Sequence, residues 1–415
     1  MGDASSFRKQ STLPLATSRN RTGVRYDVAR DIPVFSDGTE WKLFGKRITR
    51  TNVVSVRAAA TADQVTTVFF TAPGPMVITA IKEVHSAAGG TAGALVKVWK
   101  DPVGGVPAAG TLITSFDANG TANTVLSGTL STATELGGQS SLILAAGDRL
   151  TVSFTGTFAA LTGVVVTVAL KEEVTETGRD YTYVSEVEGG LIDRCIFVAP
   201  AACKLVGVSE VHSTAGTDSG AVTLQVKKGT TALLTAALSL KTTINTPQNG
   251  TLVTTEGVVD IAPGDRIVLD YTGTTTALAG VCITLKFAVA DPTLSFVNVT
   301  HLAAGNMADE AFFIAPYAGA LAFGASVHGT ATNGAAKAQV VKDTGTNAPG
   351  AGTDTLTNAS NAGFDVNSTA DTFEDAGFSL TRTVPAFAAG NRLSLDYSAA
   401  TTGGAANVVS LAVKF

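Results

Sequence analysis

The chain has 415 residues and a formal net charge of −5, and only 15% of its residues are charged. Since soluble domains usually carry about 25% charged residues, we expect a surface covered largely by hydroxyl groups and small side chains. No apolar run reaches the roughly 18 residues of a membrane-spanning helix, and residues 1–12 lack the apolar segment of a secretion signal. We therefore expect no membrane association, and a length sufficient for about two to four domains.

The first 50 residues differ from the rest in charge. They hold ten Lys and Arg against five Asp and Glu, a net +5, whereas the remainder holds 19 against 29, a net −10. Short β-like runs here are too small for an independent core, and Asp37-Gly38 between two of them predicts a tight turn. Residues 1–50 are therefore predicted to be an arm for attachment or oligomerisation. Its candidate contact residues are Arg19, Arg21, Arg25, Arg30 and Trp41.

Two short signatures recur three times after the arm. The first is a proline followed twelve residues later by a histidine, and the second is Gly-Asp-Arg, with Gly-Asn-Arg in the third copy. A period of about 110–120 residues is the size of a whole domain. The recurring positions are Pro73, His85, Asp148, Pro200, His212, Asp265, Pro316, His328 and Asn391.

Each repeat is rich in Val and Thr, which favour extended backbone. Alternation of apolar and polar residues is clear in 150–154, and we find no helical period. About seven or eight short strands per repeat are typical of a β-sandwich or jelly roll. The predicted fold is all-β: an arm at 1–50, then three tandem antiparallel, jelly-roll-like β-sandwich domains at 51–172, 173–290 and 291–415.

The second signature is interpreted as a turn. Glycine there supplies an unusual backbone angle, and the aspartate can accept hydrogen bonds from amides of its own turn. Calcium or phosphate binding is the alternative, but Asn391 in the third copy lacks the carboxylate that a metal would need.

The histidines allow a second metal hypothesis. Glu83 and Glu210 stand two residues before His85 and His212, so each pair shares one face of a strand. A carboxylate and an imidazole could join one metal ion. Ser326 takes the place of the glutamate in the third copy, however, and no further ligand is near in sequence. Hydrogen-bonded structural histidines are favoured, and we expect no metal and no cofactor.

Three cysteines, Cys195, Cys203 and Cys282, all lie in the second repeat. An odd number that is absent from the other repeats does not form a disulfide framework. Free thiols are expected, and a bridge between Cys195 and Cys203 across the turn at Pro200 stays open.

Motifs of the common enzyme classes are absent from the sequence: it has no nucleophile elbow, zinc-protease helix, Walker loop or zinc-type cysteine repeat. We therefore predict a protein that is not an enzyme, with a polysaccharide depolymerase as a distant alternative. The basic arm could contact nucleic acid electrostatically, but the acidic body opposes wrapping, so we do not expect a nucleic-acid partner.

Two arm segments, Leu13-Pro14-Leu15-Ala16 and Phe35-Ser36-Asp37-Gly38-Thr39-Glu40-Trp41, resemble segments of tailed-bacteriophage fibre and head-fibre proteins. The Ala/Thr/Gly-rich β-domains likewise resemble jelly-roll modules of phage virion surface proteins, including capsid decoration proteins. The resemblance implies a non-enzymatic structural protein on the virion surface, anchored by its arm and often trimeric. Its partners would be capsid, tail or portal proteins and further copies of itself. The resemblance extends over the whole chain in general character only, and it assigns no functional residue.

The competing hypothesis is a tail adhesin that binds host-surface glycans. Residues 343–362 form the loop of the third repeat that departs most from its sister repeats. This loop would be the tip that contacts the receptor, and its shortening would abolish glycan binding.

Overall fold

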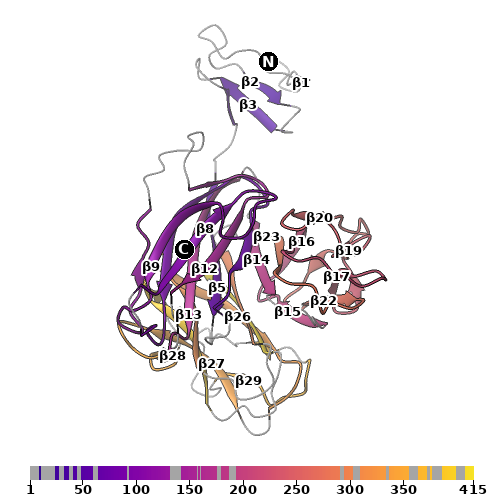
Figure 1. Ribbon diagram of the computed structural model, residues 1–415. Helices are drawn as coiled ribbons and strands as arrows, with labels where there is room; N and C mark the ends of the chain where they lie inside the picture. Colours follow the sequence, from indigo (N-terminus) through magenta and orange to yellow (C-terminus); the bar gives the residue numbers. More distant parts are fainter. Residues whose placement is uncertain are drawn as a thin grey trace, which may run out of the picture. The chain divides into compact units, whose positions relative to one another are not determined.

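The structure is a computed structural model, and Figure 1 shows it as a ribbon. The chain divides into two compact units, Met1–Arg50 with Glu173–Thr177, and Thr51–Glu172 with Gly178–Phe415. We call the second unit the body. The structure describes residues 9–10, 24–27, 32–36, 41–43, 48–58, 64–90, 93–130, 142–156, 158, 160–174, 179–186, 193–289, 294–301, 309–332, 336–354, 363–371, 374–375, 386–398 and 407–415.

The first unit contains a four-stranded sheet with the order β1-β2-β3-β4. Its strands are β1 (Lys9–Gln10), β2 (Val24–Asp27), β3 (Ile32–Ser36) and β4 (Trp41–Leu43). β3 and β4 pair antiparallel, with Ser36 opposite Trp41, and Arg25 lies in β2 opposite Val34. The predicted turn at 37–40 and the candidates Arg19, Arg21 and Arg30 lie outside the described residues.

The body is built from three pairs of sheets, one pair from each sequence repeat. We call residues 51–172, 173–290 and 291–415 repeats 1, 2 and 3. Repeat 1 contains β5 (Ile48–Ala58), β6 (Thr67–Thr71), β7 (Met76–Val84), β8 (Leu95–Asp101), β9 (Thr111–Asp117), β10 (Leu126–Ser127), β11 (Ile143–Leu144), β12 (Arg149–Thr155) and β13 (Val164–Val174). Repeat 2 contains β14 (Arg179–Glu186), β15 (Arg194–Val198), β16 (Cys203–Val211), β17 (Thr223–Lys228), β18 (Thr231–Ala232), β19 (Leu238–Ser239), β20 (Gln248–Gly250), β21 (Asp260–Ile261), β22 (Arg266–Thr272) and β23 (Val281–Val289). Repeat 3 contains β24 (Leu294–His301), β25 (Glu310–Ile314), β26 (Gly319–Val327), β27 (Lys337–Asp343), β28 (Thr353–Asp354), β29 (Phe364–Asp365), β30 (Glu374–Asp375), β31 (Ala386–Phe387), β32 (Arg392–Tyr397) and β33 (Asn407–Lys414).

The strand order is the same in the three repeats. The sheets of repeat 1 run β10-β7-β13-β5, with β11 also on β7, and β6-β12-β8-β9. The corresponding sheets are β20-β16-β23-β14 and β15-β22-β17-β18 in repeat 2, and β30-β26-β33-β24 and β25-β32-β27-β28 in repeat 3. The prediction of an all-β, antiparallel, sandwich-type fold is confirmed. The three sheet pairs belong to one compact unit, so separately folded domains with the predicted boundaries stay a prediction.

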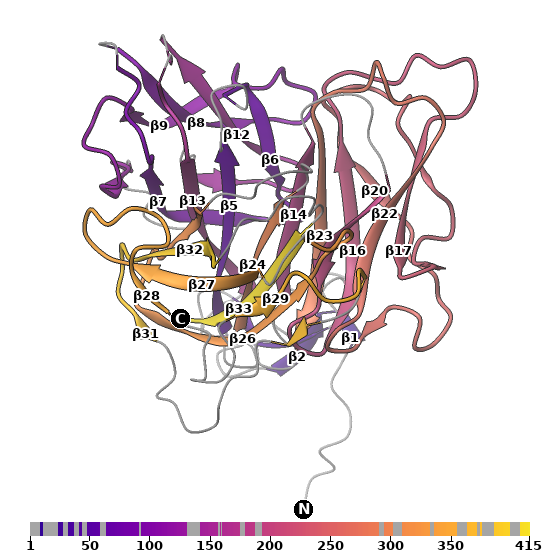
Figure 2. The ribbon, with the colours of Figure 1, turned by 90° about the horizontal axis from the view of Figure 1, so that it is seen from below.

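Neighbouring repeats share their hydrophobic cores. Phe296 of β24 packs into the core of repeat 2, with its ring centroid 5.5 Å from that of Phe197 and 6.0 Å from that of Phe287. In the same way Val53 of β5 and Ala169 of β13 belong to the core of repeat 3. Figure 2 shows the three repeats side by side in the body, coloured from indigo through magenta to yellow.

Glycine is required where the turn after β22 approaches another backbone. Gly273 has φ +93°, and a Cβ atom there would lie 2.1 Å from the carbonyl oxygen of Ala221. We expect Gly273→Ala to lower the free energy of unfolding by about 2–4 kcal/mol, measured by urea denaturation. The control is Gly257→Ala, where φ is +78° but the space is open, and which should cost about 1 kcal/mol. Equal losses in the two variants would show that the close approach is not the cause.

Candidate functional site: the junctions between repeats

The two sequence signatures meet in each repeat. Pro73 begins the bend that leads from β6 in one sheet to β7 in the other. The amide of Ala72 donates to the carbonyl of Asp148 at 2.7 Å, and the amide of Gly147 donates back to the carbonyl of Ala72 at 2.7 Å. The same two bonds join the bend at Pro200 to Asp265 and the bend at Pro316 to Asn391. In each repeat, two backbone hydrogen bonds therefore join the bend at the proline to the turn that contains the second signature.

The side chain that follows glycine in the second signature accepts a hydrogen bond within its own turn. Asp148 and Asp265 accept from the amides of Ala145 and Ala262, both at 2.9 Å. Asn391 accepts from Ala388 at 2.7 Å through its amide oxygen. An amide oxygen and a carboxylate oxygen serve equally as acceptors, which explains why asparagine stands in the third copy.

The recurring histidines are buried and hold a loop. Nε2 of His85, His212 and His328 lies 3.2, 3.3 and 3.0 Å from the backbone carbonyls of Gly120, Thr242 and Ser368. A carbonyl can only accept, so Nε2 carries the proton in each case.

The other ring nitrogen differs among the repeats. Nδ1 of His85 lies 3.1 Å from Glu83, and Nδ1 of His212 lies 3.0 Å from Glu210. Because Nε2 already carries a proton, each of these contacts needs a further proton between the imidazole and the carboxylate. In repeat 3 the hydroxyl of Ser326 bonds Asn407 instead, and Nδ1 of His328 has no hydrogen-bond partner among the described residues.

The shared proton of the buried pairs Glu83–His85 and Glu210–His212 is bound more tightly than a proton on the free side chains. Burial raises the pKa of the Glu83 carboxyl above its usual range, against the opposing influence of His85. Burial alone would lower the pKa of His85, but the hydrogen bond and charge of Glu83 raise it above the usual value, and Glu210 has the same effect on the pKa of His212.

This arrangement predicts a pH-dependent stability. A histidine whose pKa is raised by folding contributes stability that is complete below its unfolded value of about 6.5 and is lost as the pH rises through the folded value. We expect the free energy of unfolding, measured in urea, to fall above about pH 6.5, by at most about 1.4 kcal/mol per pH unit for each pair. Glu83→Gln should reduce this slope, and an unchanged slope would contradict the assignment.

The loops held by the histidines present a second recurring residue. Asn123, Asn245 and Asp371 have positive φ angles of 60°, 58° and 63°. Their amides donate to the carbonyls of His85, His212 and His328 at 2.7–2.8 Å. Asparagine and aspartate tolerate this backbone conformation better than most residues, so their side chains are fixed in place at the edge of the repeat.

Each of these side chains accepts a hydrogen bond from the arginine of the neighbouring repeat. Arg149 of repeat 1 donates to Asn245 of repeat 2 at 3.1 Å. Arg266 of repeat 2 donates to Asp371 of repeat 3, and Arg392 of repeat 3 donates to Asn123 of repeat 1 at 3.4 Å. The three contacts run from 1 to 2, from 2 to 3 and from 3 back to 1, so they close a ring. We call them the rim contacts.

Two of the three arginines are fully buried. Arg149 is 0% exposed and Arg392 1%. Arg149 also donates to the carbonyls of Pro102 and Gly105, and Arg392 donates to those of Gly345 and Asn347. Burial lowers the pKa of both guanidinium groups, but arginine stays charged in proteins.

A second ring of hydrogen bonds closes the same junctions. The amides of Thr71, Val198 and Ile314 donate to hydroxyl groups of the next repeat at 3.3, 3.2 and 3.0 Å. The acceptors are Thr284, Ser410 and Thr167. Buried apolar side chains cluster around each of these bonds.

The sequence interpretation included the arginines only as part of a turn and missed their partners. The available signal was an Asn or Asp followed by threonine downstream of each histidine: Asn123-Thr124, Asn245-Thr246 and Asp371-Thr372. The distance from the histidine varies with the length of the intervening loop, so this signal does not align with the two obvious signatures.

Other candidate sites have no chemistry of their own in the described residues. Within these residues no group of three or more His, Cys, Asp or Glu side chains could hold a metal ion. Cys195, Cys203 and Cys282 are free thiols, and burial raises the pKa of Cys195 and Cys282 to about 12. In the part of the chain that the structure describes, no helix is long and apolar enough to span a membrane.

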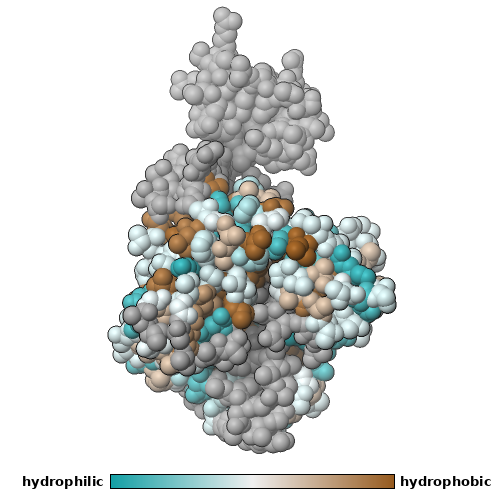
Figure 3. All heavy atoms as spheres, viewed as in Figure 1, coloured by the Kyte–Doolittle hydropathy of each residue, from teal (hydrophilic) through white to brown (hydrophobic). Residues whose placement is uncertain are grey.

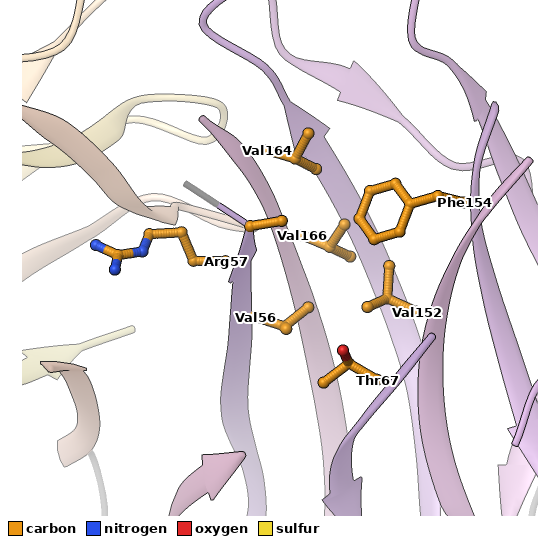
Figure 4. Close-up of a pocket in the computed structure, with 8 residues that line it drawn as sticks. Val56, Arg57, Thr67, Val152, Phe154, Val164 and Val166 are labelled. Carbon is orange, nitrogen blue, oxygen red and sulfur yellow. The ribbon is translucent and has the colours of Figure 1, made fainter. Parts of the chain in front are cut away.

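A small hollow lies between the two sheets of repeat 1, and Figure 4 shows its lining. The side chains that face it are apolar except for the hydroxyl of Thr67, which donates to the carbonyl of Val65. The guanidinium of Arg57 points away from the hollow and pairs with Glu310 of repeat 3. The hollow therefore presents no reactive group.

No protein-family model matches the chain, and no curated protein matches its sequence.

Proposed function

We propose that this chain is a non-enzymatic structural protein of a tailed-bacteriophage virion, a capsid decoration protein or a fibre. Residues 1–50 attach it to other virion proteins, and the body is displayed on the virion surface. The observation that carries the proposal is that the recurring polar residues have structural roles. The histidines and their glutamates hold loops, the Gly-Asp turns hold the bends between sheets, and the arginines join neighbouring repeats.

The division of the chain supports the assignment of an attachment role to the arm. Residues 1–50 belong to a compact unit separate from the body, and they carry the net positive charge that the body lacks. On the face seen in Figure 3, the described residues are mostly in pale tones, with apolar side chains in small groups. A surface of this kind suits a display module better than a binding cleft.

A deletion of residues 1–47 tests the attachment, because it keeps β5 (Ile48–Ala58) whole. The shortened chain should unfold at the same urea concentration as the full chain but fail to co-sediment with phage particles that lack the protein. Equal co-sedimentation of the two chains would overturn the proposal.

We also propose that the chain forms a homo-oligomer, a trimer, through its arm. In the body, the surfaces that join one repeat to the next are already occupied within a single chain, so they are not free for another copy. Sedimentation equilibrium should give a trimer for the full chain and a monomer for the chain lacking residues 1–47. A trimer of the shortened chain would place the contact in the body.

The glycan-binding alternative has less support. The first part of the loop at 343–362 is engaged within repeat 3, because Asp343 accepts from Ser394 and the carbonyls of Gly345 and Asn347 accept from Arg392. Residues 355–362 lie outside the described part of the chain. Binding to a glycan array that is lost when 355–362 are removed would favour this alternative.

A further inference from the structure

The three rim contacts are equivalent in position but differ in chemistry. At the junctions of repeats 1 and 2 and of repeats 3 and 1, a buried arginine donates to a neutral asparagine. At the junction of repeats 2 and 3 the contact is an ion pair between Arg266 and Asp371, whose side chains are 28% and 63% exposed. Ion pairs near the surface contribute little and are screened by salt.

The same junction lacks the loop that braces the other two arginines. In repeats 1 and 3 the segment after β8 or β27 supplies two carbonyls to the arginine. In repeat 2, β17 ends at Lys228 and β18 starts at Thr231, which leaves a two-residue turn. Among the described residues no carbonyl accepts from Arg266, and the hydrogen-bond partner of its guanidinium there is Asp371.

Away from the rim, the same junction is held firmly. Phe296 of repeat 3 is 2% exposed and packs against Phe197 and Phe287 of repeat 2. Asn298 donates to the carbonyl of Ile196 at 2.7 Å and accepts from Ser410 at 2.8 Å. If the rim opened, repeats 2 and 3 would therefore rotate relative to each other about these contacts, which would stay intact.

We propose that the body opens locally at the rim between repeats 2 and 3, with Arg266 and Asp371 as a salt-sensitive latch and Phe296 as the fixed side. Opening uncovers the apolar cluster of Val198, Val327 and Val408, beside which Cys195 is packed. The other two rims stay closed because their arginines are buried and braced.

Hydrogen exchange in the full chain tests this directly, because each junction offers equivalent amides as internal controls. The amides of Thr71, Val198 and Ile314 each donate to a hydroxyl group of the next repeat. We expect the amide of Val198, at the junction of repeats 2 and 3, to exchange about tenfold faster than those of Thr71 and Ile314, as for the loss of one or two net hydrogen bonds. Its rate should rise further when NaCl is raised from about 0.05 M to about 0.5 M. Equal protection at the three junctions, or highest protection at Val198, would overturn the proposal.

Substitutions separate the latch from general salt effects. Asp371→Asn keeps the acceptor oxygen and removes the charge, so the exchange rate of the Val198 amide should no longer depend on salt. The control is Asp365→Asn, because Asp365 also pairs with a lysine at the surface of repeat 3 but lies outside the rim. The exchange rate should still depend on salt in the control variant. If it also depended on salt in Asp371→Asn, the latch would be refuted.

The cysteines give a second readout in the unmodified protein. Cys195 is partly exposed and packs against the apolar cluster at the junction of repeats 2 and 3, whereas Cys282 is buried in that of repeats 1 and 2. The test is therefore the salt dependence of each rate. A neutral thiol reagent followed by peptide mass spectrometry should modify Cys195 at a rate that increases with salt and Cys282 at a rate that does not. A salt-dependent rate at Cys282 and not at Cys195 would place the opening at the wrong junction.

Discussion

Replacing Arg149 with alanine is expected to lower the free energy of unfolding of the body by about 3–5 kcal/mol. The guanidinium is fully buried and donates to Asn245 and to the carbonyls of Pro102 and Gly105. Its removal leaves these acceptors unpaired and takes away the positive charge that interacts with the buried carboxylate of Asp101, which keeps its hydrogen bonds from Ala108, Gly110 and Thr151. Urea denaturation followed by tryptophan fluorescence measures the loss, since Trp99 lies in the same repeat.

The matched control for this prediction is Arg266→Ala. Arg266 has the equivalent place in repeat 2, but it makes one exposed ion pair, so its loss should cost no more than about 1 kcal/mol. If the two variants lost equal stability, burial and the bracing carbonyls would not be what distinguishes the junctions.

Replacing Phe296 with alanine should cost about 3–5 kcal/mol, as for other large aromatic residues in cores. The cavity would form in repeat 2, although residue 296 belongs to repeat 3. Hydrogen exchange should therefore show lost protection in β15 (Arg194–Val198) and β23 (Val281–Val289), whose Phe197 and Phe287 contact the ring.

The control on the same repeat is Phe323→Ala. Phe323 is 45% exposed, so its truncation should change stability by no more than about 0.5 kcal/mol. Loss of protection confined to repeat 3 in the Phe296 variant would show that the two repeats do not share a core.

The sequence was informative where the structure is local. A composition rich in Val and Thr predicted strands, and the Gly-Asp signature predicted a turn in which the aspartate accepts from its own backbone, as Asp148 and Asp265 do. Asn391 was only an argument against a metal, and its role as an acceptor for the amide of Ala388 came from the structure. These features depend on residues close together in the chain, so their chemistry can be recognised in a short segment.

Contacts between repeats could not be predicted in the same way. The rim contacts join Arg149 to Asn245 and Arg392 to Asn123, residues that are far apart in the sequence and lie in different repeats. A repeated sequence shows that each copy has the same surfaces, but not which copy binds which. The place of Phe296 in the core of repeat 2 was hidden for the same reason, because its strand is apolar whichever core it fills.

The meeting of the first and last repeats has a consequence for biosynthesis. Val53 and Ala169 complete the core of repeat 3, yet they emerge from the ribosome long before the strands that cover them. We expect nascent chains stalled before β24 (Leu294–His301) to bind a hydrophobic dye and to be degraded rapidly by added protease, since apolar surface exposed during synthesis promotes aggregation and cleavage. Emergence of β33 (Asn407–Lys414), which pairs with both β24 and β26, should end both properties together, so that survival of the whole body would depend on this one strand.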